Sequence, residues 1–140
     1  MSLAIVYTRA ALGIEAPLIT VEVHLSNGLP GLTMVGLPET TVKEARDRVR
    51  SALINSGYAF PAKKITINLA PADLPKEGGR YDLPIALALL VASEQLNTTR
   101  LNQYEFVGEL APTGGLRGVP GAIPSAMEAI KAGRRIVVSS

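Results

Sequence analysis

The chain has 140 residues, of which 47% are hydrophobic and 19% charged, with a formal net charge of +2. This composition is typical of a single globular domain over 1–140 and not of a disordered chain, and the small basic excess permits nucleic-acid binding without indicating it. The absence of cysteine excludes disulfides, thiolate zinc sites and redox chemistry, and without a secretory signal or a long apolar run we expect a cytoplasmic protein with no membrane partner.

The first third of the chain is expected to form strands. An apolar run covers 4–8, and 18–25 alternates polar and apolar residues with the period of a strand that has one buried face. Asn27-Gly28 indicates a tight hairpin turn before a third strand over 32–37, so we expect the chain to open with an antiparallel sheet. His24, the only histidine, lies on the polar side of 18–25, where we interpret it as solvated rather than catalytic.

A first helix is predicted up to Ser56. Thr41 and Glu44 have the spacing of a capping box at its start, and Gly57 is a predicted C-cap. One helix face is apolar, which predicts packing against a core. The residues of that stripe are Val42, Ala45, Val49, Ala52 and Leu53.

Strands and helices alternate in the remaining sequence. A strand is predicted at 64–69, a loop rich in proline and glycine at 70–81, and an almost wholly apolar helix at 83–96 with Pro84 in its first turn. A strand at 106–110, a glycine-rich segment at 112–121, a helix from Pro124 to Ala132 and a strand at 135–139 complete the prediction.

Several motifs in fixed order closely resemble the opening domain of the bacterial ComM/YifB family, also called magnesium-chelatase-like or ChlI-like ATPases. They are Val35 to Pro38, Val42 to Arg50, Asn55 to Gly57, Ile67 to Asp73, Lys76 to Ala86 and Gly108 to Leu110. The resemblance implies an α+β fold, a two-layer sheet-and-helix domain of the type found in Lon peptidase domains and a ribosomal small-subunit protein.

In this family an AAA+ ATPase module follows the first domain. These 140 residues contain no Gly-x-x-x-x-Gly-Lys-[Ser/Thr] phosphate loop, so we expect ATP and Mg²⁺ to bind in that other module and no cofactor or metal here. The resemblance implies a hexameric motor on branched DNA, active in natural transformation and recombination. Its expected partners are its own AAA+ module, neighbouring subunits and DNA. A magnesium-chelatase-like complex is the rival function.

The segment 74–86 also resembles the nucleophile loop of Lon-type serine peptidases, whose serine is activated by a distant lysine. Depending on the alignment, Gly79, Arg80 or Tyr81 stands where the serine would be, and Arg117 stands in place of the lysine. Arginine stays protonated at any workable pH and cannot act as the base. We therefore expect no catalytic residue, with a degenerate peptidase as the alternative.

Two further sites have an ordinary structural interpretation beside a functional one. Glu77 and Asp82 are spaced for acid–base work, but flanking Lys76 and Arg80 favour ion pairs at a turn, and Asp82 is also placed to cap the helix that follows. The glycine-rich segment 114–118 would form either a tight turn or an anion-binding nest.

Basic residues supply the candidates for DNA contact. The first group is Lys43, Arg46, Arg48, Arg50, Lys63 and Lys64, and a second contains Lys131, Arg134 and Arg135. On a monomer such residues mostly solvate a surface, and Glu44 and Arg48 have the i,i+4 order of a helix ion pair. In a ring the same residues recur in every subunit, so that counterion release from several phosphates adds up.

Overall fold

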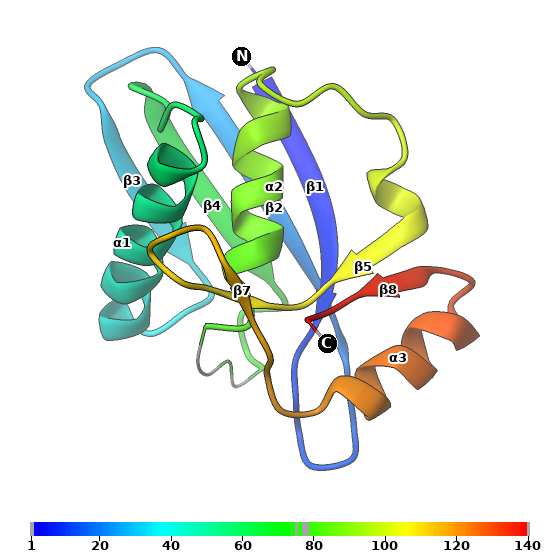
Figure 1. Cartoon of the computed structure of the whole chain (residues 1–140). Coiled ribbons are helices and arrows are strands. Elements are labelled where there is room, and N and C mark those ends of the chain that lie inside the picture. The colour runs from blue at the N-terminus through cyan, green and yellow to red at the C-terminus, as the bar shows by residue number, and fades with distance from the viewer. Residues whose placement is uncertain (1, 75, 77–78, 140) are drawn as a thin grey trace.

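The computed structural model describes residues 2–74, 76 and 79–139. Within these residues, six strands form a mixed sheet in the order β3-β4-β2-β1-β5-β8 (Figure 1). The β1–β2 and β2–β4 pairs are antiparallel and the other three pairs are parallel. The strands are β1 (Ser2–Arg9), β2 (Leu18–Ser26), β3 (Gly31–Val35), β4 (Lys64–Ala70), β5 (Tyr104–Phe106) and β8 (Arg135–Val137).

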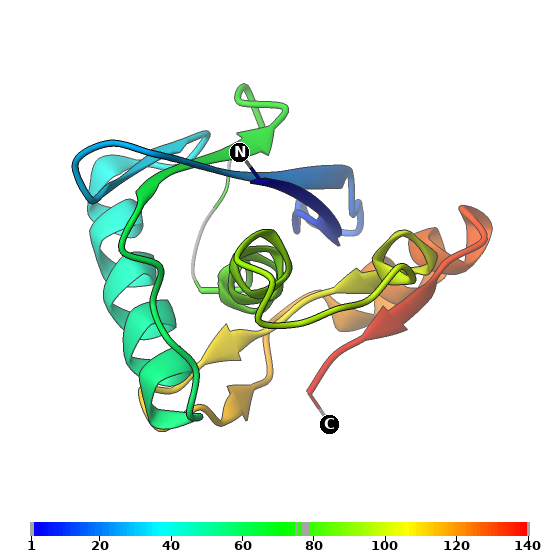
Figure 2. The ribbon, with the colours of Figure 1, turned by 90° about the horizontal axis from the view of Figure 1, so that it is seen from above.

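Helices pack on both faces of this sheet. They are α1 (Glu39–Asn55), α2 (Asp82–Ala92) and α3 (Ala122–Lys131), with a short 3₁₀ turn at Leu101–Gln103. α1 and α2 lie on one face, and α3 lies on the opposite face beside β8 (Figure 2). α2 packs on β1 and β2, and α1 lies beside it. A small antiparallel pair, β6 (Glu109–Leu110) and β7 (Leu116–Arg117), lies on the side of α2 that faces away from β1 and β2 (Figure 2). The predicted α+β class is confirmed. None of the helices in the described part of the chain is long and apolar enough to cross a membrane.

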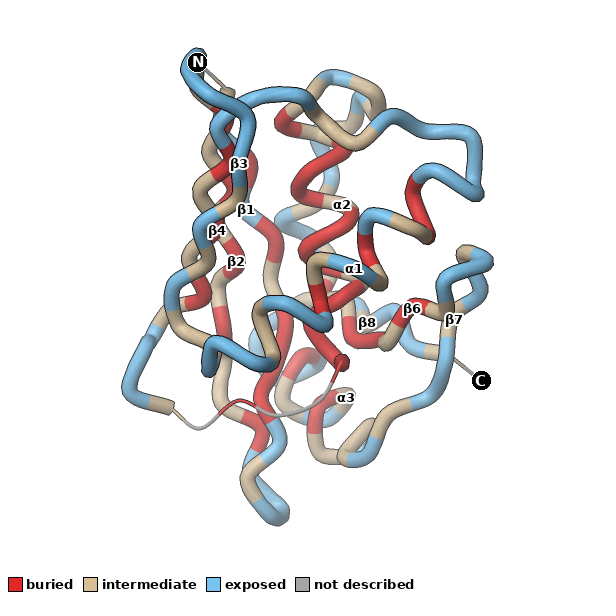
Figure 3. The backbone as a smooth tube through the Cα atoms, turned by 90° about the vertical axis from the view of Figure 1, so that its left-hand side faces the viewer, coloured by how far each residue is buried: buried red, intermediate tan, exposed pale blue. Residues whose placement is uncertain are grey.

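The core lies between α2 and the sheet. The inward residues of β2 that the alternation predicted, Ile19, Val21 and Val23, are fully buried, and buried residues run along nearly all of α2 (Figure 3). α2 ends at Ala92, four residues before the predicted end, because the Ser93 hydroxyl donates to the Leu89 carbonyl and the next residue turns to a left-handed φ of 61°. Pro84 does lie in its first turn.

The predicted hairpin at Asn27-Gly28 is wrong. β3 does not pair with β2, because β4 lies between them, antiparallel to β2 and parallel to β3. The burial pattern explains this order: β4 buries Ile65, Ile67 and Leu69 completely, whereas the inward residues of β3 are only partly buried. The longer apolar strand takes the central position and the shorter one takes the edge.

α1 differs from its prediction at the start and agrees at the end. The helix begins at Glu39 after Pro38 and has no side-chain cap, so the capping box at Thr41 is wrong. At the other end Gly57 has a φ of +89°, and its N–H and that of Tyr58 donate to the Ile54 and Leu53 carbonyls. This is a Schellman C-cap, as predicted. The apolar stripe is buried except for Val42, which is partly buried.

The last third of the chain is more broken than predicted. The strand expected at 106–110 is two strands in different sheets, since Gly108 leaves the main sheet to exchange backbone hydrogen bonds with Arg80 and Leu83 at the start of α2. α3 begins at Ala122 rather than Pro124, after Gly121 with a φ of +80°, and β8 ends at Val137 rather than Ser139.

Candidate functional site

The two positions that would carry a Lon-type dyad lie on either side of one carboxylate. Glu109, at the start of β6, approaches Gly79 so closely that a Cβ atom added to this glycine would overlap the glutamate side chain. Glu109 also forms an ion pair with Arg117 of β7, with 3.4 Å between the Arg117 Nη1 and Glu109 Oε2 atoms. A serine at position 79 would therefore collide with Glu109, and the place of the lysine holds a guanidinium that is already paired.

Beside this carboxylate lies a cavity of about 560 Å³. Its walls come from residues 11–13 after β1, residues 79–81 before α2, Glu109, and residues 118–120 before α3. The chain thus keeps a hollow of a size usual for small ligands at the position where the resemblance places peptidase chemistry.

Arg80 and Tyr81 are buried at the edge of this cavity. Arg80 donates to the carbonyl oxygens of Arg9 at 2.9 Å and Pro120 at 2.6 Å, and to the Ser125 hydroxyl at 3.1 Å. The Tyr81 hydroxyl has no hydrogen-bond partner among the described residues, and burial raises the pKa of Tyr81 to about 12. Neither side chain is an activated nucleophile.

Asp82 has a different partner from those predicted. Its carboxylate accepts two hydrogen bonds from Arg48 of α1, at 2.7 and 3.2 Å, and one from the Leu110 N–H at 3.1 Å. Asp82 therefore neither caps α2 nor pairs with Arg80. Burial raises the pKa of Asp82, and the hydrogen bond from Arg48 opposes this shift.

Of the other two members of the predicted turn cluster, the structure describes Lys76. Lys76 is buried and its Nζ donates to the Pro71 and Leu74 carbonyls, and burial lowers its pKa. Glu77 lies outside the described residues. The glycine-rich segment forms the turn between β6 and β7, where Gly114 has a φ of +99° and the Ala111 N–H donates to the Gly115 carbonyl. The turn interpretation accounts for these glycines.

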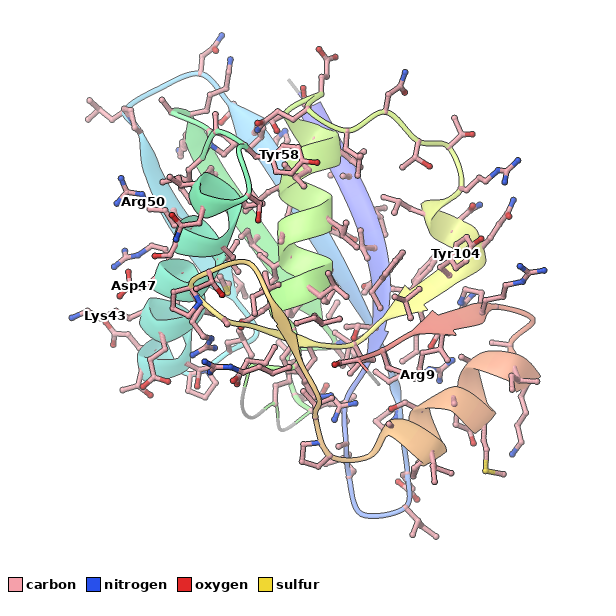
Figure 4. All side chains as sticks on the ribbon, in the orientation of Figure 1. Arg9, Lys43, Asp47, Arg50, Tyr58 and Tyr104 are labelled. Atoms are coloured by element: carbon pink, nitrogen blue, oxygen red, sulfur yellow. The ribbon has the colours of Figure 1, made fainter. Side chains whose placement is uncertain are left out.

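Part of the basic group surrounds a second hollow, of about 470 Å³, between α1 and the segment that leads into β4. Arg46, Arg50 and Lys63 line it together with Asp47. We call this hollow, with its three cationic side chains, the basic groove. Lys43 is exposed on the same helix, and Figure 4 shows Lys43, Asp47 and Arg50 on the outer side of α1, away from α2. Lys64, at the start of β4, is also exposed.

The remaining basic candidates are separated from the groove. Arg48 is engaged with Asp82 and its side chain is only 20% exposed. Arg134 pairs with Glu105 at 2.9 Å and stacks over the Tyr7 ring at 4.4 Å, Lys131 pairs with Glu128, and Arg135 is exposed on β8. The structure thus brings together three of the six first candidates and gives Arg48 a structural partner.

A buried ion network at the other end of the sheet was not predicted from the sequence. Glu105 is fully buried and accepts two hydrogen bonds from Arg9, at 2.7 and 2.9 Å, and one from Arg134. A signal was present, because each of Arg9 and Glu105 is a charged residue inside an apolar strand segment, and such charges are rarely buried unless paired.

Comparison with known proteins places the chain in a family. The sequence model described as subunit ChlI of Mg-chelatase matches residues 21–140. The chain is 81% identical over 140 residues to the uncharacterized protein YifB of Salmonella typhimurium, and 65% identical over 139 residues to the competence protein ComM of Haemophilus influenzae. The alignments include 100% and 99% of this chain, but only 28% and 27% of the length of the two relatives.

A more distant relative, an uncharacterized protein of Mycobacterium tuberculosis, is 37% identical over 138 residues, which are 99% of this chain and 27% of that protein. The chain therefore spans little more than a quarter of the length of the curated relatives it matches. With a family model across most of its length and high identity to YifB and ComM, the chain belongs to the ChlI-like, magnesium-chelatase-like family, in its ComM/YifB group.

Proposed function

We propose that these residues form the non-catalytic accessory domain of a ComM-type hexameric AAA+ ATPase that moves DNA branches during natural transformation and recombination in the cytoplasm. The observation that carries the proposal is the 65% identity to competence protein ComM over 139 residues. ATP and Mg²⁺ bind in the ATPase module, outside these residues, and the domain contributes to ring assembly and DNA contact.

The geometry around Glu109 supports a non-catalytic role. A serine at position 79 would have to displace the Glu109 side chain, and the Arg117 guanidinium remains charged beside this glutamate. A Ser-Lys mechanism needs a neutral amine next to a free hydroxyl, and this pair of positions supplies neither.

DNA contact is supported by the basic groove. Arg46, Arg50 and Lys63 surround one hollow, with Asp47 as the acidic residue in its lining. The side chains of Arg46 and Asp47 are 42% and 67% exposed and 3.8 Å apart, a geometry in which an ion pair is weak and readily exchanged for a phosphate. In a ring, grooves on successive subunits would release counterions from several phosphates together.

Replacing Arg46, Arg50 and Lys63 together with alanine in the full-length protein should weaken binding to forked DNA by roughly tenfold or more at low salt. The slope of log affinity against log salt should become shallower by about 0.9 for each phosphate that the variant no longer neutralises. Fluorescence anisotropy with a labelled fork over a series of salt concentrations measures both quantities.

The matched control removes the same charge from the other end of the domain. Arg100, Lys131 and Arg135 are exposed, and they lie near α3 and β8 rather than on α1. Their alanine variant should keep the wild-type affinity and salt slope. If both triple variants lose the same affinity for DNA, net charge alone explains the effect. If the groove variant binds DNA as tightly as wild type, DNA contact at this face is contradicted.

Assembly with the rest of the polypeptide is supported by an apolar stripe on α3. Ile123, Met127 and Ile130 follow one another at i, i+4 and i+7 and are 75%, 57% and 70% exposed. Exposed apolar side chains that line up on one helix face usually mark an interface. Because nearly three quarters of the relatives' length lies outside the matched segment, we assign the AAA+ module of the same polypeptide as the occupant.

A photo-crosslinking amino acid in place of Met127 in the full-length protein should therefore crosslink to the AAA+ module of its own chain. Mass spectrometry of the crosslinked peptides identifies the contact. The control position is Leu29, which is 90% exposed in the turn after β2. Crosslinks from Met127 to a second copy of this domain, or the same products from both positions, would contradict the assignment.

A second candidate function follows from the family description, subunit ChlI of Mg-chelatase. In that case the domain would serve as an interaction module of a chelatase-like complex without touching DNA. Unchanged DNA binding after deletion of the domain, together with capture of a chelatase subunit, would favour this candidate over the DNA motor.

A further inference from the structure

The cavity beside Glu109 is separate from the basic groove and has no assigned role. It has a volume of about 560 Å³ and is lined by segments that are far apart in the chain. Most of its walls are small or apolar, including Ala11, Leu12, Val119 and Pro120. The polar side chains in the lining are those of Arg80, Tyr81 and Glu109, so the charges of Arg80 and Glu109 determine which ligands it can hold.

Arg80 is a buried cation whose partners in the described part of the chain are all neutral. The residue is 4% exposed, and its three hydrogen bonds go to two backbone carbonyls and one hydroxyl. Within residues 2–74, 76 and 79–139, no carboxylate pairs with it. A guanidinium has five N–H donors, so two of them lack an acceptor among these residues. Burial lowers the pKa of Arg80, as expected for a charge without a counterion.

The other deeply placed arginines are neutralised. Arg9 donates two hydrogen bonds to the Glu105 carboxylate, and Arg48 donates two to the Asp82 carboxylate. Each therefore satisfies the rule that a buried charge is paired. Among the described residues Arg80 departs from this rule, and it does so at the wall of the cavity beside Glu109.

The charges in the wall define the ligand. Glu109 already has a partner in Arg117 at 3.4 Å, so among the described residues Arg80 is the positive charge in this wall that has no carboxylate partner. One positive charge calls for one negative charge, and a planar guanidinium fits a carboxylate. We propose that this cavity binds an aliphatic carboxylate through Arg80, supplied either by a free organic acid or by the end of a peptide.

The test measures carboxylate binding to the full-length protein by calorimetry at fixed ionic strength. The probes are propionate and a short peptide ending in alanine, with propionamide and the amidated peptide as their neutral counterparts, and inorganic phosphate. We expect saturable binding of a carboxylate and none of its amide. Preference for propionate identifies a free acid as the source, and preference for the peptide identifies a chain end.

The variant that blocks the cavity leaves Arg80 untouched. A side chain added at Gly118 meets no atom within 4 Å, and this glycine does not need a left-handed φ, so Gly118→Leu should fold and fill the cavity. The same change at Gly115, in the same segment but outside the lining, is the control. Gly118→Leu should weaken carboxylate binding at least about tenfold, because the ligand can no longer reach its charged donor, and Gly115→Leu should not.

Three results would overturn the proposal: no saturable carboxylate binding by the wild type, equal binding by Gly118→Leu, or binding of phosphate alone. The variant Glu77→Gln adds a fourth, because binding that appears only in this variant would identify Glu77 as the counterion of Arg80. DNA affinity should be the same in Gly118→Leu and wild type, so the outcome is independent of the basic groove.

Discussion

Replacing Arg48 with alanine is expected to lower the free energy of unfolding of this domain by about 3 kcal/mol. The reason is the state in which the change leaves Asp82, whose carboxylate is fully buried and accepts two of its three hydrogen bonds from this arginine. Without the guanidinium, a buried charge keeps one backbone N–H as its partner. Urea unfolding followed by circular dichroism measures the decrease.

Arg46 supplies the matched control, because it lies on the same helix with its side chain 42% exposed and a weak contact to Asp47. Arg46→Ala should change stability by no more than about 0.5 kcal/mol. Adding Asp82→Asn to Arg48→Ala should recover much of the stability, since the amide removes the charge and keeps an acceptor for the Leu110 N–H. No recovery would mean that the decrease came from packing rather than from the charge.

The deficit of Arg48→Ala should also depend on pH. Burial raises the pKa of Asp82 above the ordinary value of 3.8, so its contribution to stability is present below that value and is lost as pH rises through the folded-state pKa. Removing Arg48 deletes the hydrogen bond that opposes the shift, and the pKa rises further. The stability gap to Arg46→Ala should therefore be narrow near pH 4 and widen toward neutrality.

Local patterns predicted the elements whose burial is one-sided or complete. The alternation at 18–25 identified β2 and its buried face, and the apolar run after Pro84 identified α2 as the central helix. Gly57 gave the end of α1 for a conformational reason, since the Schellman cap needs a left-handed residue. Each of these signals is carried by residues close together in the chain.

Features that depend on distant partners were not predictable in the same way. Asn27-Gly28 is a local hairpin signal, but the position of β3 was decided by β4, which lies more than 30 residues further along. The partner of Asp82 was sought among its neighbours and is Arg48, 34 residues away. Nothing in the local sequence marks Glu109 as the side chain that fills the serine position beside Gly79.

Replacing Glu105 with glutamine should have the largest effect on the fold, a decrease of about 4 kcal/mol or more against a typical domain stability of about 5–15 kcal/mol. The carboxylate is fully buried between Arg9 and Arg134, whose side chains are only 8% and 19% exposed. A neutral amide leaves two guanidiniums converging without a counterion, and its own N–H groups add donors where acceptors are needed. Urea unfolding of the variant and of wild type measures the difference.

The strands that lose hydrogen-exchange protection show whether Glu105→Gln destabilises one end of the sheet or the whole domain. Glu105 joins β1 to β5 and to Arg134, which precedes β8, whereas β2 and β4 are held by a long antiparallel ladder and the aliphatic core. Hydrogen exchange should therefore rise first in β5, β8 and α3 and last in β2 and β4. Glu128→Gln, which removes an ion pair with Lys131 between exposed side chains, should leave both stability and exchange nearly unchanged. Uniform loss of protection over the whole sheet would show that the network stabilises the domain as one unit rather than holding this end of the sheet.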